Sequence, residues 1–244
     1  MRMLLVGEEP FLPEQEKPSS FVDSEALRDV WLIRRSETIR ASSKPSSIGA
    51  TGLAKSEKEE ADSGDVSYRK GRGGTSIGRA VHSVLQSVGL MTGEGVDEVS
   101  QAQAAAEGLP NRWKEVASLA RTAMESDVVK QAVSTGRYDR EVYVGAPEGE
   151  VLIEGFVDLV FETEEGLIIV DYKTDGIETA EEISRSMESY RLQGDTYALC
   201  LESATGKSVT KVIFLFLHTG VEFVMDDLPG AMDDVRDAVA NLIA

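Results

Sequence analysis

Two aspartates and a lysine interrupt neighbouring apolar segments of the chain. Asp158 lies within Gly155–Phe161, whereas Asp171 and Lys173 lie within Ile168–Thr174. A short polar turn with a glycine separates the two segments, a pattern typical of a β-hairpin. A charged side chain on a buried strand is costly unless a partner compensates it. Two carboxylates that converge beside a lysine therefore indicate a divalent cation as that partner.

Strand geometry supports this convergence. Because side chains alternate between the faces of a strand, Asp171 and Lys173 share one face. The same alternation predicts that Asp158 shares a face with Phe156 and Val160, and a hairpin can place Asp158 beside Asp171. Carboxylate oxygens hold Mg²⁺ or Mn²⁺, which polarise a phosphate and lower the pKa of a bound water. The pattern favours metal-dependent hydrolysis of a phosphodiester.

Four motifs carry a family resemblance. Asp158 and the segment Asp171–Lys173 resemble the signature of the PD-(D/E)XK nuclease superfamily, and more narrowly that of RecB/AddA-type nuclease domains attached to UvrD-like DNA helicases. Gly78–His82 resembles the upstream histidine motif of this subgroup, and Tyr190–Ala198 resembles its QxxxY helix. The motifs follow the order of the subgroup, and the match covers roughly residues 71–225.

The resemblance implies a fold and a metal site. The fold would be α/β, with a restriction-endonuclease-like core in which helices flank a mixed central sheet. The metal ligands would be His82, Asp158, Asp171 and the backbone carbonyl of Tyr172. Asp158, Asp171 and Lys173 would be the catalytic residues, with Lys173 orienting or activating water. The implied cofactor is Mg²⁺ or Mn²⁺.

Further residues are candidates for supporting the site or binding the substrate: Arg72, Arg79, Glu141, Gln193 and Tyr197. Glu141 is either another acid of the site or a solvent-facing strand residue. The basic, glycine-rich segment around Arg72 is either a contact to a DNA backbone or a flexible connector. Tyr197 lies on an apolar helical stripe and is equally a core residue, so Gln193 at the stripe edge is the stronger functional candidate.

The histidine motif lies on a predicted helix. Apolar residues from Ile77 to Val88 recur at the spacing of an amphipathic helix. His82 lies about 140° from Ile77 around this helix, away from the apolar stripe, at 100° per residue. A lone histidine is usually structural or simply exposed, but a position on the flank of the stripe suits a metal ligand at the edge of a cleft.

The chain is predicted to have three parts: an N-terminal arm (1–70), a nuclease domain (71–225) and a C-terminal helix packed on that domain (226–244). The arm would be extended, with a short helix at 24–39 and a flexible linker at 42–75, where serine, glycine, lysine and glutamate dominate. In the domain we expect a helix, a helical insertion, three strands, a helix and a strand.

Composition limits the classes of protein. The chain has 244 residues, 41% of them hydrophobic, and lacks the apolar run of about 18 residues that a membrane helix needs. The single cysteine, Cys200, excludes internal disulfides and a four-cysteine iron–sulfur cluster. We expect a cytoplasmic location. The net charge of −18 argues against tight DNA binding by the chain alone, because DNA affinity draws on lysine and arginine.

The expected function is Mg²⁺- or Mn²⁺-dependent cleavage of DNA in repair or recombination. The resemblance implies single-stranded DNA delivered by a UvrD-like helicase, present in a longer parent chain or acting in trans. One alternative is a nuclease-fold binding or assembly module without turnover, and another is a nuclease for RNA or a repair intermediate. The complete set of Asp158, Asp171 and Lys173 favours a catalytic protein.

Overall fold

The computed structural model describes residues 28–36, 47–56, 75–175, 180–228 and 231–243. The chain divides into two compact units, Met1–Lys44 and Pro45–Ala244. In the first unit residues 28–36 form a helix, which lies within the range predicted for it. The candidate residues at described positions all belong to the second unit.

The second unit alternates helices and strands. Its strands are β1 (Ser47–Gly49), β2 (Tyr138–Glu148), β3 (Val151–Glu162), β4 (Leu167–Lys173), β5 (Val209–Phe216) and β6 (Val221–Met225). Its helices are α2 (Ala50–Ser56), α3 (Ser76–Ser87), α4 (Val96–Ala106), α5 (Trp113–Glu125), α6 (Asp127–Thr135), α7 (Ala180–Thr205) and α8 (Ala231–Ile243), with a 3₁₀ turn at Pro110–Arg112. From α3 onward the predicted order of elements is confirmed.

The strands form one six-stranded mixed sheet. β2 pairs antiparallel along one edge of β3. The other edge of β3 carries β4, antiparallel at Leu159–Glu162, and β1, parallel at Leu152–Glu154. β4 and β5 are parallel, and β6 closes the sheet antiparallel to β5. The parallel β4–α7–β5 crossover places α7 on one face of the sheet.

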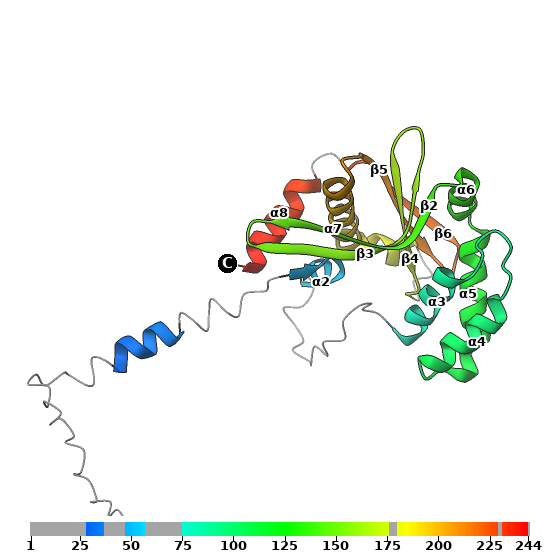
Figure 1. The fold of residues 1–244 in the computed structure, drawn as a ribbon, viewed down its shortest axis with the longest axis horizontal. Coiled ribbons are helices and arrows are strands. Elements are labelled where there is room, and N and C mark those ends of the chain that lie inside the picture. The colour runs from blue at the N-terminus through cyan, green and yellow to red at the C-terminus, as the bar shows by residue number, and fades with distance from the viewer. Residues whose placement is uncertain (1–27, 37–46, 57–74, 176–179, 229–230, 244) are drawn as a thin grey trace, which may run out of the picture. The chain divides into compact units, whose positions relative to one another are not determined.

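Helices cover both faces of the sheet (Figure 1). Helices α3 to α6 pack on one face, with Ile168 and Val170 of β4 turned toward them. Helices α2, α7 and α8 pack on the other, with Leu167 and Ile169 turned toward α7. Because both faces of β4 are covered, its sequence is continuously apolar up to Asp171. The prediction of an α/β fold with a mixed sheet flanked by helices is confirmed.

β1 and α2 correct one prediction. Residues 47–56 lie within the segment expected to be a flexible linker, and for these residues the expectation is wrong. Ile48, Ala50 and Leu53 are buried in the core on the α7 side, Leu53 completely. Three well-spaced apolar side chains and the open edge of β3 are enough to order a short strand and helix, although serine and glycine dominate the local composition.

Helix α3 forms as its sequence predicts. Thr75 caps its first turn by accepting a hydrogen bond from the backbone N–H of Gly78. The apolar stripe, including Ile77 and Val81, is buried against the sheet, and His82 lies off that stripe. No helix within the described ranges combines the length and apolar character that a membrane span requires.

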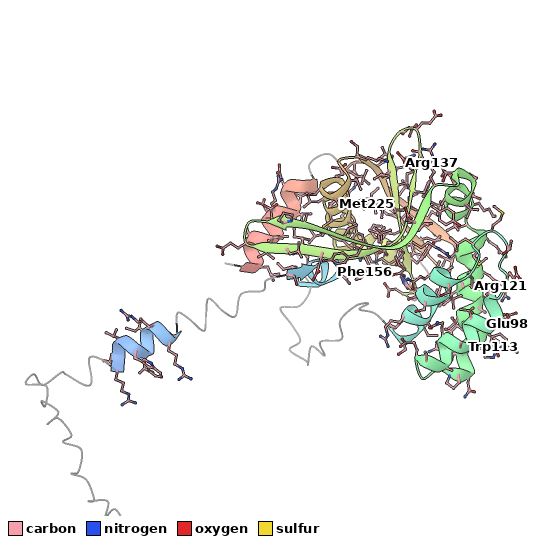
Figure 2. The ribbon with its side chains drawn as sticks, in the orientation of Figure 1. Glu98, Trp113, Arg121, Arg137, Phe156 and Met225 are labelled. Carbon is pink, nitrogen blue, oxygen red and sulfur yellow. The ribbon has the colours of Figure 1, made fainter. Side chains whose placement is uncertain are left out.

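Helix α7 approaches the sheet closely at Gly194. A β-carbon added there would lie 3.1 Å from Sδ of Met225 and 3.2 Å from Cζ of Phe214. Met225, at the end of β6, is labelled in Figure 2. Any larger residue would push the helix away from β5, so the glycine lets α7 present its next residues to the ends of the strands. The proposed capping residue of α7, Thr179, lies outside the described residues.

The outer half of the β2–β3 hairpin has one exposed face. Phe156 of β3, labelled in Figure 2, is 43% exposed and contacts Tyr143 of β2, with ring centroids 5.4 Å apart. The hydroxyl of Tyr143 donates to Glu154. The opposite face of the same segment packs through Ile153 and Val157 against the α7 layer.

Candidate active site

The candidate site forms where β3 and β4 separate. The ladder between the two strands ends at the pair Leu159 and Val170, and Asp158 and Asp171 are the next residues on each strand. The backbone N–H of Tyr172 donates to Oδ2 of Asp158 at 2.7 Å. The Asp158 carboxylate thus satisfies a buried backbone donor that the neighbouring strand no longer reaches.

The alternation of β3 is interrupted at the same point. Val157 and Val160 both lie in the core on the α7 side although they are three residues apart, while Leu159 lies in the core on the α3 side. The expectation that Asp158 shares a strand face with Val160 is therefore wrong. Across from Asp158, Glu141 of β2 has a φ of 53° and is the only non-glycine residue with positive φ among those the structure describes.

A left-handed glutamate in a strand is strained by roughly 1–3 kcal/mol. Such strain persists only where surrounding contacts fix it, and here it turns Glu141 toward the site. The Glu141 side chain is 6% exposed, and its Oε1 lies 3.9 Å from Nδ1 of His82. Of the two alternatives for Glu141, the solvent-facing strand residue is therefore wrong.

His82, Glu141 and Asp158 form the first group of the site. One potential ligand atom from each lies within 4.8 Å of the others. Nδ1 of His82 is 2.7 Å from Oδ1 of Asp158, and the Asp158 side chain is 7% exposed. Helix α3 supplies the imidazole and the strands supply the carboxylates, so the three meet only in the folded unit.

Asp171, Lys173 and Gln193 form the second group. Nζ of Lys173 lies 2.7 Å from Oδ2 of Asp171 and donates to Oε1 of Gln193 at 2.6 Å. The rings of Tyr190 and Phe214 lie 4.9 Å and 5.1 Å from the same Nζ. Lys173 is thus held by two polar partners and two aromatic faces, with 11% of its side chain exposed.

The Gln193 amide links this group to two hydroxyls. Its Nε2 donates to the hydroxyl of Tyr197 at 3.0 Å and to Oγ1 of Thr51 at 3.1 Å, and it lies 3.5 Å from Oδ1 of Asp171. Tyr197 is 4% exposed, so it belongs to the core and to the site at once. Sequence reasoning missed Thr51, because its surroundings show neither a motif nor a clear period.

The charges of the site perturb one another. Burial disfavours the charged form of His82, but Asp158, Asp171 and Glu141 outweigh burial and raise its pKa to about 9. Burial raises the pKa of Asp171 against the opposing attraction of Lys173, and Asp158 raises it further. Each carboxylate therefore depends on a nearby positive charge.

The residues present fit a hard divalent cation. Among these side chains three carboxylates face one ammonium, which leaves two negative charges when His82 is neutral. Carboxylate oxygens with one imidazole nitrogen are a donor set suited to Mg²⁺ or Mn²⁺. The candidate ligands His82, Asp158 and Glu141 lie together, and Asp171 lies beside Lys173 in the adjoining group.

Three other candidates have different surroundings. The ring of Tyr172 is buried and meets His82 with centroids 6.1 Å apart, while the ligand role of its backbone carbonyl stays a prediction. Arg79 forms an ion pair with Glu107 at 2.7 Å and donates to Ser76. Arg72 lies outside the described residues.

Comparison with known proteins agrees with this geometry. A family model described as the PD-(D/E)XK nuclease superfamily matches residues 61–244. An ATP-dependent helicase/nuclease from Thermoanaerobacter sp. (strain X514) is 30% identical over 174 residues, which are 63% of this chain and 14% of the relative. The protein of the same name from Clostridioides difficile (strain 630) is 45% identical over 67 residues, 27% of this chain and 5% of the relative.

Among solved structures, a putative exonuclease from Eubacterium rectale aligns with a TM-score of 0.42 and 13% identity, covering 79% of this chain and 71% of that one. The chain spans about a seventh of the length of the Thermoanaerobacter relative. The family model, in contrast, covers most of the chain, including both groups of the site apart from Thr51. The chain therefore belongs to the PD-(D/E)XK nuclease superfamily.

Proposed function

We propose that this protein is a Mg²⁺- or Mn²⁺-dependent DNA nuclease that cuts single-stranded DNA supplied by a helicase. The observation that carries the proposal is the meeting of two groups at the end of the β3–β4 ladder. One group, His82, Glu141 and Asp158, offers ligands. The other places an ammonium, Lys173, beside a further carboxylate, Asp171.

The proposed metal ligands are His82, Asp158 and Asp171 with the backbone carbonyl of Tyr172, and the structure adds Glu141 as a candidate. When bound, the ion would supply Lewis-acid activation of the phosphate and a water of lowered pKa. His82 must be neutral to act as a ligand. Its contact with Asp158 orients the ring for that role, since a carboxylate at one ring nitrogen fixes the tautomer.

Lys173 is the proposed residue for orienting the attacking water and for stabilising charge on the phosphate. Its ammonium is held within hydrogen-bond distance of Asp171 and Gln193, so its position is set before substrate arrives. A charge fixed in advance costs little reorganisation during the reaction. Gln193 and Tyr197 would support this arrangement through their mutual hydrogen bond.

The helicase enters the proposal through the relatives, which are called ATP-dependent helicase/nucleases. The chain covers a small part of those proteins, so the motor would lie in a longer parent chain or act in trans. The net charge of −18 supports the same idea, because such a chain binds DNA weakly by itself. Delivery by a tethered helicase would raise the local DNA concentration to about millimolar. A cytoplasmic role in DNA repair or recombination belongs to this proposal.

The test is digestion of linear and circular DNA, single- and double-stranded, with Mg²⁺, Mn²⁺ or EDTA. We expect cleavage of single-stranded DNA with either metal and none with EDTA. Asp171→Ala should be inactive, whereas Asp139→Asn, an exposed carboxylate on β2, should cleave like the wild type. Cleavage that survives EDTA or Asp171→Ala would refute the proposal. Tight DNA binding without cleavage would favour the assembly module, and preference for RNA would replace the substrate.

A further inference from the structure

The segment β1–α2 lies outside the family match but contacts the candidate site. The family model begins at residue 61, whereas β1 and α2 span residues 47–56. Thr51, in the first turn of α2, accepts a hydrogen bond from Nε2 of Gln193, which lies 142 residues later in the chain. Gln193 in turn contacts both Lys173 and Asp171.

The position of Thr51 is fixed by packing on both sides of it. Ala50 is 1% exposed and Leu53 is fully buried, and both lie in the core with α7. β1 pairs in parallel with β3, four residues before Asp158 at the nearest pair. A β-carbon added at Gly155 would lie 2.7 Å from Cε1 of Tyr197 and 3.3 Å from Cβ of Ala50, so β3, α7 and α2 meet closely here.

The orientation of the Gln193 amide follows from its partners. An ammonium only donates hydrogen bonds, so the amide oxygen must face Lys173. The amide nitrogen then faces the hydroxyls of Thr51 and Tyr197 and the carboxylate of Asp171. Without Thr51 the nitrogen loses one of its two close acceptors, and the amide is less firmly held against rotation.

We propose that Thr51 is a positioning residue, which acts through the Gln193 amide to hold Lys173 and Asp171 in their reactive arrangement. The inference rests on the proposed nuclease function and extends the working site to a segment that the family model does not match. Gln193 is the residue that connects Thr51 with both Lys173 and Asp171, so the effect of Thr51 passes through this amide.

The matched variants are Thr51→Val, which keeps the shape and removes the hydroxyl, and Thr51→Ser, which keeps the hydroxyl. We expect kcat to fall about tenfold in Thr51→Val, as is typical for partners that orient a site, with KM little changed. Thr51→Ser should restore kcat to near the wild-type value. Thr122→Val, on α5, removes a hydroxyl bonded within its own helix and serves as the neutral control.

A double-mutant cycle separates positioning from general stability. In a Gln193→Leu background, Thr51→Val should cause no further loss of kcat, because the pathway is already broken. The midpoint of thermal unfolding should stay close to that of the wild type in Thr51→Val. Leu53→Ala, which opens a cavity under the same helix, should lower the midpoint clearly.

A second readout does not need activity. In protein labelled with ¹⁵N at glutamine, the side-chain amide signal of Gln193 is assigned by its loss in Gln193→Leu. It should shift in Thr51→Val and return in Thr51→Ser. An unmoved signal, or additive losses in the double-mutant cycle, would overturn the role of Thr51. If the wild type itself is inactive, the function fails, and the amide signal still decides whether Thr51 holds Gln193.

Discussion

Nδ1 of His82 on α3 lies 2.7 Å from Oδ1 of Asp158 on β3, across a separation of 76 residues. This contact joins the α3 layer to the strand at the point where the β3–β4 ladder ends. The imidazole also lies near Glu141. In the absence of metal a protonated His82 is therefore part of what holds the carboxylates together.

The stability of the metal-free protein should depend on the charge of His82. Its pKa is raised from 6.5 to about 9, so the folded state keeps a proton that the unfolded state loses. The stabilisation is fully present below pH 6.5 and disappears as pH rises through about 9. It amounts to at most about 3 kcal/mol. Urea unfolding with EDTA at several pH values should show this loss in the wild type and a flatter profile in His82→Gln. Equal profiles would contradict a charged His82.

Glu141 should trade stability for metal binding. Glycine adopts a φ of 53° without strain, so Glu141→Gly should unfold at the same temperature as the metal-free wild type or higher. The increase in melting temperature caused by Mn²⁺ should shrink, because a ligand is lost. Glu141→Gln separates the effects, since it removes the charge and keeps the strain. An unchanged Mn²⁺ effect in both variants would exclude Glu141 from the metal site.

Lys173 should be needed for turnover and not for metal binding. Lys173→Ala removes the ammonium beside Asp171 and should lower kcat by about 10²–10³, the usual loss for a group that is fixed in advance. Mn²⁺ should still stabilise the variant against heat. By contrast, Asp158→Ala should lose both cleavage and most of that stabilisation. A Lys173→Ala protein that cleaves at the wild-type rate would remove Lys173 from the mechanism.

Asp195 should be a destabilising residue at neutral pH. It is 5% exposed on α7, and burial raises its pKa to about 6, against Arg191 and together with Asp234 and Asp227. The folded state thus holds a proton more tightly than the unfolded state, and stability falls as pH rises from about 4 to 6. Asp195→Asn should gain on the order of 2 kcal/mol at pH 7 and little at pH 4.

Urea unfolding of Asp195→Asn at the two pH values checks this prediction. Asp139→Asn, at an exposed position on β2, is the control and should change stability little at either pH. A loss of stability in Asp195→Asn at pH 7 would mean that the charged carboxylate has a favourable partner.

Several parts of the site could be predicted from local sequence. The apolar period of α3 placed His82 off the buried stripe, and alternation along β4 placed Asp171 and Lys173 on one face, where both meet Gln193. These features depend on residues a few positions apart, and the repeat of a helix or strand fixes them. The spacing of Gln193 and Tyr197 on α7 belongs to the same class.

Other parts were decided by tertiary structure. Glu141 faces the site because its backbone is left-handed, which no pattern of neighbouring residues specifies. The break in alternation at Asp158 arises where β4 leaves β3 and Tyr172 turns its N–H to the carboxylate. The pairing of Arg79 with Glu107 likewise joins separate helices.

The sequence by itself determined the motifs, their order and the elements that carry them. It did not determine that residues 47–56 would complete the sheet and bring Thr51 to Gln193. The physical reason is that Ile48, Ala50 and Leu53 gain their stability from burial against β3 and α7, which lie far away along the chain. Local composition reports the cost of ordering such a segment, and only the packed structure reports the surface that it buries.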